Sequence, residues 1–181
     1  SFRSYINGAW VEGGAGTIAV DNPNNGEALS QQAAADAADV DRAVQAAQAV
    51  HDSGTLSDLR PVERARMIQK MSADISANKD RVAPLLTLES GKPLWEAEIE
   101  VDSAARFLEF YGNQAESLEG RSIPLGASYF DFTTFEPYGV SGQIIPWNFP
   151  LEITARGIGP ALATGNAVVV KTPEIDPLSH F

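Results

Sequence analysis

The chain has 181 residues, enough to bury a hydrophobic core, and its 44% hydrophobic and 20% charged content is typical of a globular protein. Its formal charge of −11 is spread along the chain, which argues against nucleic acid and anionic membranes as partners, because both attract clusters of lysine and arginine. There is no cysteine, so disulfides, thiolate metal sites and thiol nucleophiles are excluded for this chain, and His51 and His180 flank no carboxylate motif, so we expect no metal site.

Residues 1–35 are predicted to be rich in β-structure. The segments 4–11 (SYINGAWV) and 17–23 (TIAVDNP) are short strand candidates. Turns are predicted at Gly13–Gly14 and at Asn22–Gly26, where small and polar residues gather.

A first helix is predicted after this part. Asp36 and Asp39 suit the N-cap and the first turn, where a carboxylate accepts hydrogen bonds from free backbone amides. Gly54 lies beyond the end of this helix. Apolar residues at helical spacing predict a buried stripe made of Val40, Val44, Ala47 and Val50.

Three further helices are predicted before residue 120. The second begins at Pro61, the third begins near Asn78 and stops at Gly91, and the fourth runs from Pro93 to about Leu118. The buried positions predicted for them are, in chain order, Val62, Ala65, Ile68, Met71 and Ile75, then Val82, Leu85, Leu86 and Leu88, then Leu94, Ala97, Val101, Ala105, Leu108, Tyr111, Ala115 and Leu118.

The segment 127–139 (ASYFDFTTFEPYG) is aromatic and β-branched, and its residues have little preference for a helix. It alternates only partly, so neither face is plainly polar. This pattern predicts an extended ribbon covered by another part of the protein or by a partner chain.

The last third predicts a strand, a helix and a second strand joined by short connections. These are residues 139–145, 151–165 and 166–171, and both strands are apolar enough to be fully buried. A strand–helix–strand unit of this kind gives a parallel pair. Because parallel sheets place ligands at the carboxyl ends of their strands, Asn148 and Lys171 are expected on the same edge.

Two interpretations of Asn148 remain open on local sequence. It either caps the following helix, or its amide donates to an oxygen that gains negative charge during a reaction. Lys171 and Glu174 are either an ordinary charged strand end or part of a nucleotide site, in which Glu174 accepts from the ribose hydroxyls and favours NAD over NADP. A glycine fingerprint for pyrophosphate is missing, because GVSG at 139–142 precedes a strand.

Four stretches together carry a family resemblance. YINGAWVEG, TLESGKPLWEA, EPYGVSGQIIPWNFPL and GPALATGNAVVVKTPE resemble the N-terminal part of the NAD(P)-dependent aldehyde dehydrogenase superfamily, from about Tyr5 to Phe181. The resemblance implies that an aldehyde is oxidised to a carboxylic acid: a cysteine attacks the carbonyl, hydride passes to the nicotinamide of NAD (NADP remains possible), and water hydrolyses the thioester with help from a glutamate.

The resemblance also implies roles for individual residues. Asn148 matches the oxyanion donor, Lys171 and Glu174 match the residues that hold the adenosine ribose, and the cofactor pocket is lined by Ile144, Ile145 and Trp147. Phe149, Ile153 and Arg156 are expected toward the aldehyde tunnel; Arg156 is either a solvated helix residue or a sign of a bulky, aromatic or anionic aldehyde. Many relatives have Trp-Lys where this chain has Arg156-Gly157, so a role for that lysine does not transfer.

The expected fold is therefore α/β and incomplete relative to the family. Residues 1–119 form the β-rich start and the helices of the cofactor-binding domain, residues 120–137 form a β-ribbon for oligomerisation, and residues 138–181 form the first βαβ unit of a Rossmann-like parallel sheet. Without a cysteine, this chain alone is expected to be inactive, and further sequence is expected to cover the open sheet edge.

The expected partners are a small aldehyde and further copies of the chain in a dimer or tetramer. The alternative is a non-catalytic fragment that acts as an oligomerisation or nucleotide-binding module. No apolar run approaches the roughly 18 residues of a membrane span, and the first ten residues contain no long apolar stretch of a secretory signal, so we expect no membrane partner and a cytoplasmic location.

Overall fold

The computed structural model describes residues 2–181, which begin with two β-hairpins. Strands β1 (Ser4–Ile6) and β2 (Ala9–Val11) pair antiparallel around Asn7 and Gly8, whose φ angles of 50° and 77° suit the Asn-Gly turn of a tight hairpin. The single strand predicted over 4–11 is therefore wrong, because this turn divides it. The turn predicted at Asn22–Gly26 is confirmed, since it joins the antiparallel strands β3 (Thr17–Asp21) and β4 (Ala28–Ala33).

Helix α1 (Ala37–Asp52) begins as predicted, but it buries a different stripe. The Asp36 side chain accepts from the Asp39 amide at 2.9 Å, and Asp39 accepts from the Asp36 amide at 3.0 Å, which forms a capping box. Asp39 also accepts from the Gly14 amide at 2.8 Å and is thereby turned inward. Asp39 and Ala47 are buried, whereas Val40 and Val44 are exposed, so the predicted stripe is wrong at those two valines.

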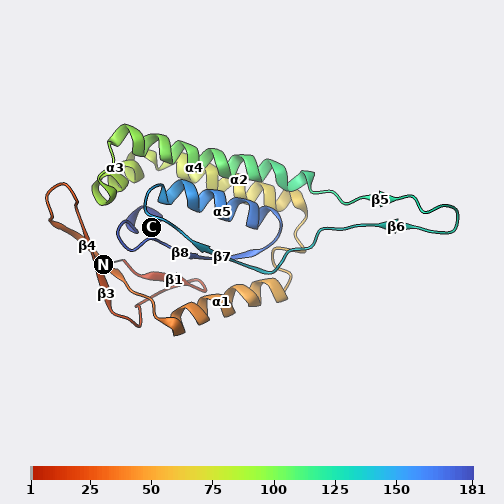
Figure 1. Ribbon diagram of the computed structural model, residues 1–181, viewed down its shortest axis with the longest axis horizontal. Helices are drawn as coiled ribbons and strands as arrows, with labels where there is room; N and C mark the ends of the chain where they lie inside the picture. The colour runs from red at the N-terminus through yellow and green to blue at the C-terminus, as the bar shows by residue number, and fades with distance from the viewer. Residues whose placement is uncertain (1) are drawn as a thin grey trace.

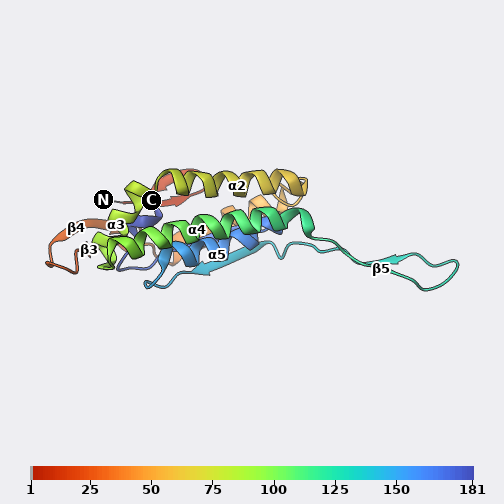
Figure 2. The ribbon, with the colours of Figure 1, turned by 90° about the horizontal axis from the view of Figure 1, so that it is seen from above.

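Three helices form one layer of the molecule: α2 (Pro61–Ala77), α3 (Lys79–Ser90) and α4 (Leu94–Gln114), the last extended by a 3-10 turn η1 (Ala115–Ser117) (Figures 1 and 2). Their predicted starts are confirmed, and Gly91 ends α3 with a left-handed φ of 76°. The core cluster contains six of the thirteen residues predicted to be buried in the second and fourth helices, and Met71 and Ile75 pack against it; the six are Ala65, Ile68, Ala97, Val101, Leu108 and Ala115.

Three leucines predicted to be buried are exposed, namely Leu88, Leu94 and Leu118. In α3 the inward position belongs to Glu89, whose carboxylate accepts from the amides of Leu178 and Ser179 at 2.5 and 2.8 Å. These amides lie in the short 3-10 helix η2 (Leu178–His180). Leu94 and Leu118 lie at the two ends of the fourth predicted helix, where fewer neighbouring side chains cover them.

Between α4 and the last third, the chain forms a long ribbon that extends away from the rest of the molecule (Figures 1 and 2). Only β5 (Ser122–Ile123) and β6 (Asp131–Phe132) pair within it. Tyr129, Phe130 and Phe135 are exposed on this ribbon, and the exposed fraction of Phe130 is 86%. The extended, aromatic segment predicted here is confirmed, and among residues 2–181 the Phe130 ring contacts the Phe132 ring, with centroids 5.4 Å apart, but remains largely exposed.

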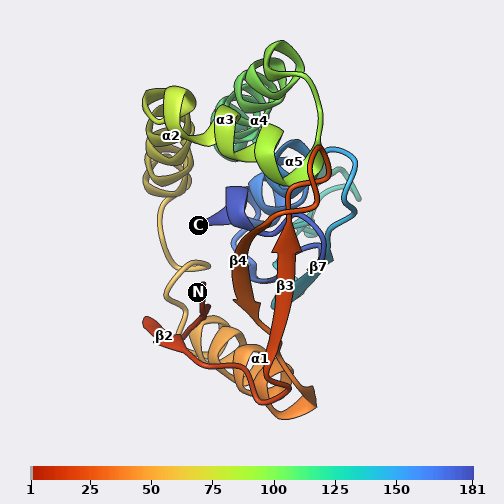
Figure 3. The same ribbon diagram turned by 90° about the vertical axis from the view of Figure 1, so that its left-hand side faces the viewer.

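The last third forms the predicted strand–helix–strand unit. β7 (Val140–Ile144) pairs parallel with β8 (Ala167–Lys171), and α5 (Pro150–Ala163) connects them. The two strands lie between α5 and α1 (Figure 1), while the β3–β4 hairpin spans the space between α1 and α3 (Figure 3). The prediction of fully buried strands is wrong for the described chain, because Gly142 and Ile144 are exposed along β7.

Candidate functional site

The carboxyl ends of β7 and β8 lie side by side. Ile144 is the register partner of Lys171, and the Ile145 amide donates to the Lys171 carbonyl at 3.1 Å. The connection that contains Asn148 and the one that contains Glu174 therefore leave the sheet at the same edge. This is the arrangement that strand order and parallel pairing predict from sequence.

Asn148 does not cap helix α5. The N-cap is Phe149, and it makes no side-chain capping hydrogen bond, so the cap interpretation of Asn148 is wrong. The Asn148 side chain is exposed, while its backbone carbonyl accepts from Lys92 Nζ at 3.0 Å. The turn thus holds the Asn148 backbone and leaves the side-chain amide at the surface.

The first turn of α5 is capped by a residue from another helix. Glu100 of α4 accepts through Oε1 from the Leu151 amide at 2.9 Å and from the Glu152 amide at 3.4 Å. Its Oε2 pairs with Lys92, and both side chains are buried, Glu100 at 0% and Lys92 at 9% exposure. A carboxylate is favourable at a helix N-terminus, because free amides and the helix dipole point toward it.

Sequence reasoning missed Lys92 and Glu100. The one available signal is position, because Glu100 falls on the same stripe of α4 as Ala97, Val101 and Ala104, which are all buried. A charged residue on an apolar stripe requires a partner, since an isolated buried charge is strongly unfavourable.

Lys171 and Glu174 bind each other at the open edge. Lys171 Nζ donates to Glu174 Oε1 at 2.5 Å, and both side chains are largely exposed. The hydrogen bond from Lys171 lowers the pKa of the Glu174 carboxyl, which keeps it ionised. An exposed pair of this kind is weak and exchanges partners readily, so both groups remain available to other hydrogen-bonding groups.

The apolar residues predicted for the cofactor separate into two groups. Ile144 and Trp147 are 83% and 62% exposed beside the Asn148 turn, whereas Ile145 is only 4% exposed. Exposed large apolar groups next to a charged pair are suited to an amphipathic ligand that has rings and hydroxyls. The structure brings Ile144 and Trp147 to this surface and places the side chain of Ile145 beneath it.

The residues predicted to face the aldehyde lie on the first turns of α5. Phe149 and Ile153 are half-buried, and Arg156 is exposed. The Arg156 guanidinium lies over the Phe107 ring at 5.5 Å from its centroid and 3.9 Å from Glu152.

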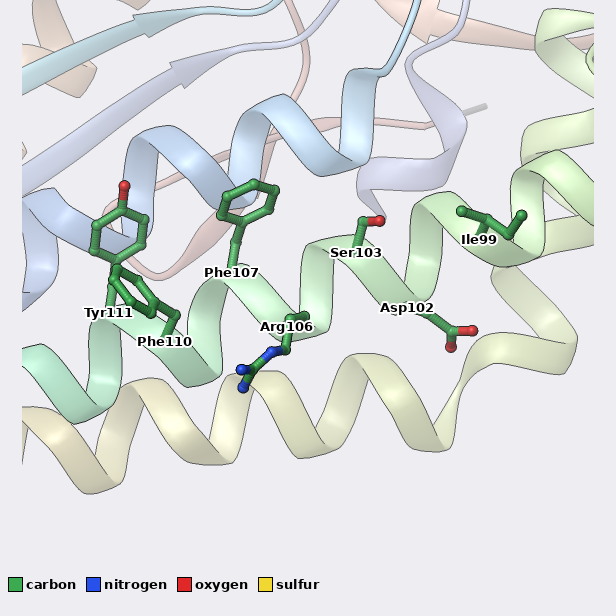
Figure 4. Close-up of a pocket in the computed structure, with 7 residues that line it drawn as sticks. All are labelled: Ile99, Asp102, Ser103, Arg106, Phe107, Phe110 and Tyr111. Carbon is green, nitrogen blue, oxygen red and sulfur yellow. The ribbon is translucent and has the colours of Figure 1, made fainter.

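Phe107 also lines a hollow of about 590 Å³ on α4, together with Ile99, Asp102, Ser103, Arg106, Phe110 and Tyr111 (Figure 4). This hollow contains none of the predicted site residues, and Phe107 is its link to Arg156.

Residues 2–181 contain no cluster of three or more histidine, cysteine, aspartate or glutamate residues arranged to bind a metal ion. None of the helices that the structure describes has the length and apolar character needed to cross a membrane.

A model of the aldehyde dehydrogenase family matches residues 10–181. The mitochondrial aldehyde dehydrogenase of Equus caballus is 39% identical over 178 residues, which cover 97% of this chain and 36% of the relative. The putative aldehyde dehydrogenase DhaS of Bacillus subtilis is 40% identical over 179 residues, 98% of this chain and 36% of the relative.

Solved structures of similar proteins also match nearly the whole of this chain and about a third of their own length. PnpE in complex with nicotinamide adenine dinucleotide is 39% identical and superposes with a TM-score of 0.94, over 99% of this chain and 37% of that one. An NADP-dependent enzyme of E. coli is 33% identical with a TM-score of 0.90, over 98% of this chain and 37% of that one. The chain therefore spans little more than a third of the length of these relatives.

Proposed function

The chain belongs to the aldehyde dehydrogenase family, a family of oxidoreductases. We propose that it is the N-terminal part of an NAD-dependent enzyme that oxidises an aldehyde to a carboxylic acid. The observation that carries this proposal is the pairing of Ile144 with Lys171, which brings the Asn148 turn and Glu174 to one sheet edge. The activity is proposed for the whole protein, since this chain spans 36% of its relatives.

In this proposal Asn148 is the oxyanion donor. Its exposed amide N–H₂ donates to the aldehyde oxygen as that oxygen gains negative charge. A donor fixed in advance stabilises the transition state more than the substrate, because it needs no reorganisation when charge develops. The nucleophilic cysteine lies outside this chain, which has none, so the chain alone is expected to give no turnover.

NAD is the proposed cofactor, and the residues at the edge fit it. Glu174 accepts from the ribose hydroxyls and Lys171 donates to ribose oxygens, while Ile144 and Trp147 contact the apolar faces of the nucleotide and Ile145 supports them from beneath. The bound nicotinamide supplies the hydride acceptor. The ionised Glu174 repels a 2′-phosphate, which disfavours NADP without preventing its use.

Phe149, Ile153 and Arg156 are proposed to contact the aldehyde. Phe149 and Ile153 offer partly exposed apolar surface, and Arg156 adds a positive charge above the Phe107 ring. An aldehyde that carries an aromatic ring or a distant carboxylate matches this combination, because guanidinium binds carboxylates and stacks on rings.

The ribbon at 120–137 is proposed to join copies of the chain into a dimer or tetramer in the cytoplasm. Its exposed rings, Tyr129, Phe130 and Phe135, are the kind of aromatic surface that protein interfaces bury. A second copy is favoured over nucleic acid, since the chain carries a formal charge of −11.

The test uses the complete enzyme with Asn148→Ala, and with Asn24→Ala as the matched control in the exposed β3–β4 turn. We expect Asn148→Ala to lower kcat by roughly 10²–10³-fold, as loss of an oxyanion donor does, with NAD affinity unchanged. Formation of NADH is followed at 340 nm with a panel of aldehydes. An unchanged kcat would refute the role of Asn148, and turnover by the 181-residue chain alone would refute its incompleteness. Binding of nucleotide without turnover by any form would favour the non-catalytic module.

A further inference from the structure

The turn that carries Asn148 is held by two buried charged side chains from outside the strand–helix–strand unit. Lys92 follows Gly91 in the connection between α3 and α4, and Glu100 lies on α4, 51 positions before Leu151. Together they contact four groups between residues 148 and 152: the Asn148 carbonyl, the Phe149 ring, and the amides of Leu151 and Glu152.

We propose that Lys92 and Glu100 are positioning residues that set the direction of the Asn148 amide for oxyanion binding; this inference rests on the function proposed above. Lys92 Nζ donates to the Asn148 carbonyl at 3.0 Å and lies 4.6 Å from the centroid of the Phe149 ring. The ammonium therefore holds the carbonyl of the Asn148–Phe149 peptide through a hydrogen bond and the Phe149 side chain through a cation–π contact.

Glu100 fixes the other end of the turn. Its Oε1 binds the Leu151 and Glu152 amides, so the start of α5 is docked on α4. Its Oε2 pairs with Lys92 and thereby holds the ammonium in place. The Asn148 carbonyl is thus held by Lys92, and the amides three and four residues later are held by Glu100, so a rotation of this turn would break one of these contacts.

The burial of Lys92 and Glu100 supports a positioning role for the pair. Burying two charges is costly, and apolar residues of similar size often stabilise a protein equally well or better. A lysine and a glutamate nevertheless lie between α4 and the one turn that carries the proposed oxyanion donor. The comparable pair between α3 and α4, Lys79 with Asp102, is more exposed and contacts no part of this turn.

The test is a double-mutant cycle in the complete enzyme. Lys92→Met alone leaves Glu100 buried and unpaired, which endangers folding. The working variant therefore combines Lys92→Met with Glu100→Gln, because the glutamine carbonyl still accepts from the α5 amides and no charge is left alone. The matched control combines Lys79→Met with Asp102→Asn. Each pair is made in the wild type and in Asn148→Ala, and the single-turnover rate of NADH formation is measured together with NAD affinity.

We expect the Lys92/Glu100 variant to lose roughly 10–100-fold in single-turnover rate, by misplacing a donor whose orientation matters, while NAD affinity stays within about twofold. In the Asn148→Ala background the same change is expected to cost less than about twofold, since coupled residues are not additive. The control pair is expected to leave the rate unchanged in both backgrounds.

An equal loss in both backgrounds would show that the pair acts on the fold generally, and no loss in the wild type would show that it does not position Asn148; either result overturns the proposal. Returning the lysine in the Glu100→Gln background restores the donor to the Asn148 carbonyl but not the ion pair, so it is expected to recover part of the rate; no recovery at all would count against Lys92. If Asn148→Ala itself leaves the rate unchanged, the proposed function fails, and this outcome is distinct from the other two.

Discussion

Replacing Asp176 by asparagine is predicted to change how the stability of the protein depends on pH. Asp176 follows β8 and is 1% exposed, and neither of its carboxylate oxygens has a hydrogen-bond partner within residues 2–181. Burial, and next the negative charge of Glu89, raise the pKa of the Asp176 carboxyl to about 7, although the positive charge of Lys92 opposes them. The folded protein therefore keeps this carboxyl protonated below about pH 7.

The direction of the effect follows from proton binding. An aspartate in the unfolded chain loses its proton near pH 4, so between about pH 4 and 7 the folded state binds one more proton than the unfolded state. The contribution of Asp176 to stability is therefore present below pH 4 and lost as the pH rises to about 7. The difference between a pKa near 4 in the unfolded chain and about 7 in the folded protein corresponds to at most about 4 kcal/mol, because local relaxation and water entry reduce the cost of a buried carboxylate.

His180 opposes this effect in almost the same range of pH. Burial lowers the pKa of His180 to about 4, and its Nε2 lies 2.9 Å from the Thr154 hydroxyl. Between pH 4 and 6.5 the unfolded chain binds the additional proton, so the contribution of His180 is lost as the pH falls through that range. The two groups largely cancel, and the wild-type profile is flatter than either group alone would give.

The assay is urea denaturation followed by circular dichroism from pH 4.5 to 8. Asp176→Asn, which resembles the protonated acid, is expected to gain about 1–3 kcal/mol relative to wild type at pH 8 and to lose most of this gain at pH 4.5. Asp21→Asn, at an exposed position in β3, is the control and is expected to shift the profile uniformly. If Asp176→Asn changes the free energy of unfolding equally at both pH values, the folded protein does not hold a protonated Asp176, and the reasoning is refuted.

Two further predictions concern the substrate and the assembly. In the complete enzyme, Arg156→Ala is expected to lower kcat/KM for anionic aldehydes by about tenfold relative to neutral ones, because a charge-assisted contact is lost. Arg106→Ala is the control. Unchanged relative kcat/KM values would refute the role of Arg156. Phe130→Ser is expected to weaken self-association about tenfold or more, as measured by analytical ultracentrifugation. Trp95→Ser, which changes another exposed ring, is the control and is expected to leave self-association unchanged. An unaltered mass distribution for Phe130→Ser would contradict the role of the ribbon.

Much of the framework was predictable because it depends on short-range patterns. Helical spacing and the turn residues Pro61 and Gly91 located α2, α3 and α4. Two apolar runs joined by a helix predicted the parallel pair, and the pairing of Ile144 with Lys171 confirms it. The common edge of Asn148 and Lys171 follows from this topology alone, since parallel strands end on the same side. The roles of the site residues and the domain boundaries after residues 119 and 137 stay predictions.

Long-range contacts decided the rest. Apolar spacing alone predicted that Val40 and Val44 lie on the buried face of α1. The contact of Asp39 with the Gly14 amide instead turns the Asp39 face of the helix inward and leaves both valines exposed. The sequence could not choose between cap and donor for Asn148, because the cap comes from Glu100, far away along the chain. The sequence by itself thus determined the elements and the edge at which they meet. Only the tertiary structure decided which buried charges hold that edge, because a charge is tolerated in the interior only where distant segments bring it a partner.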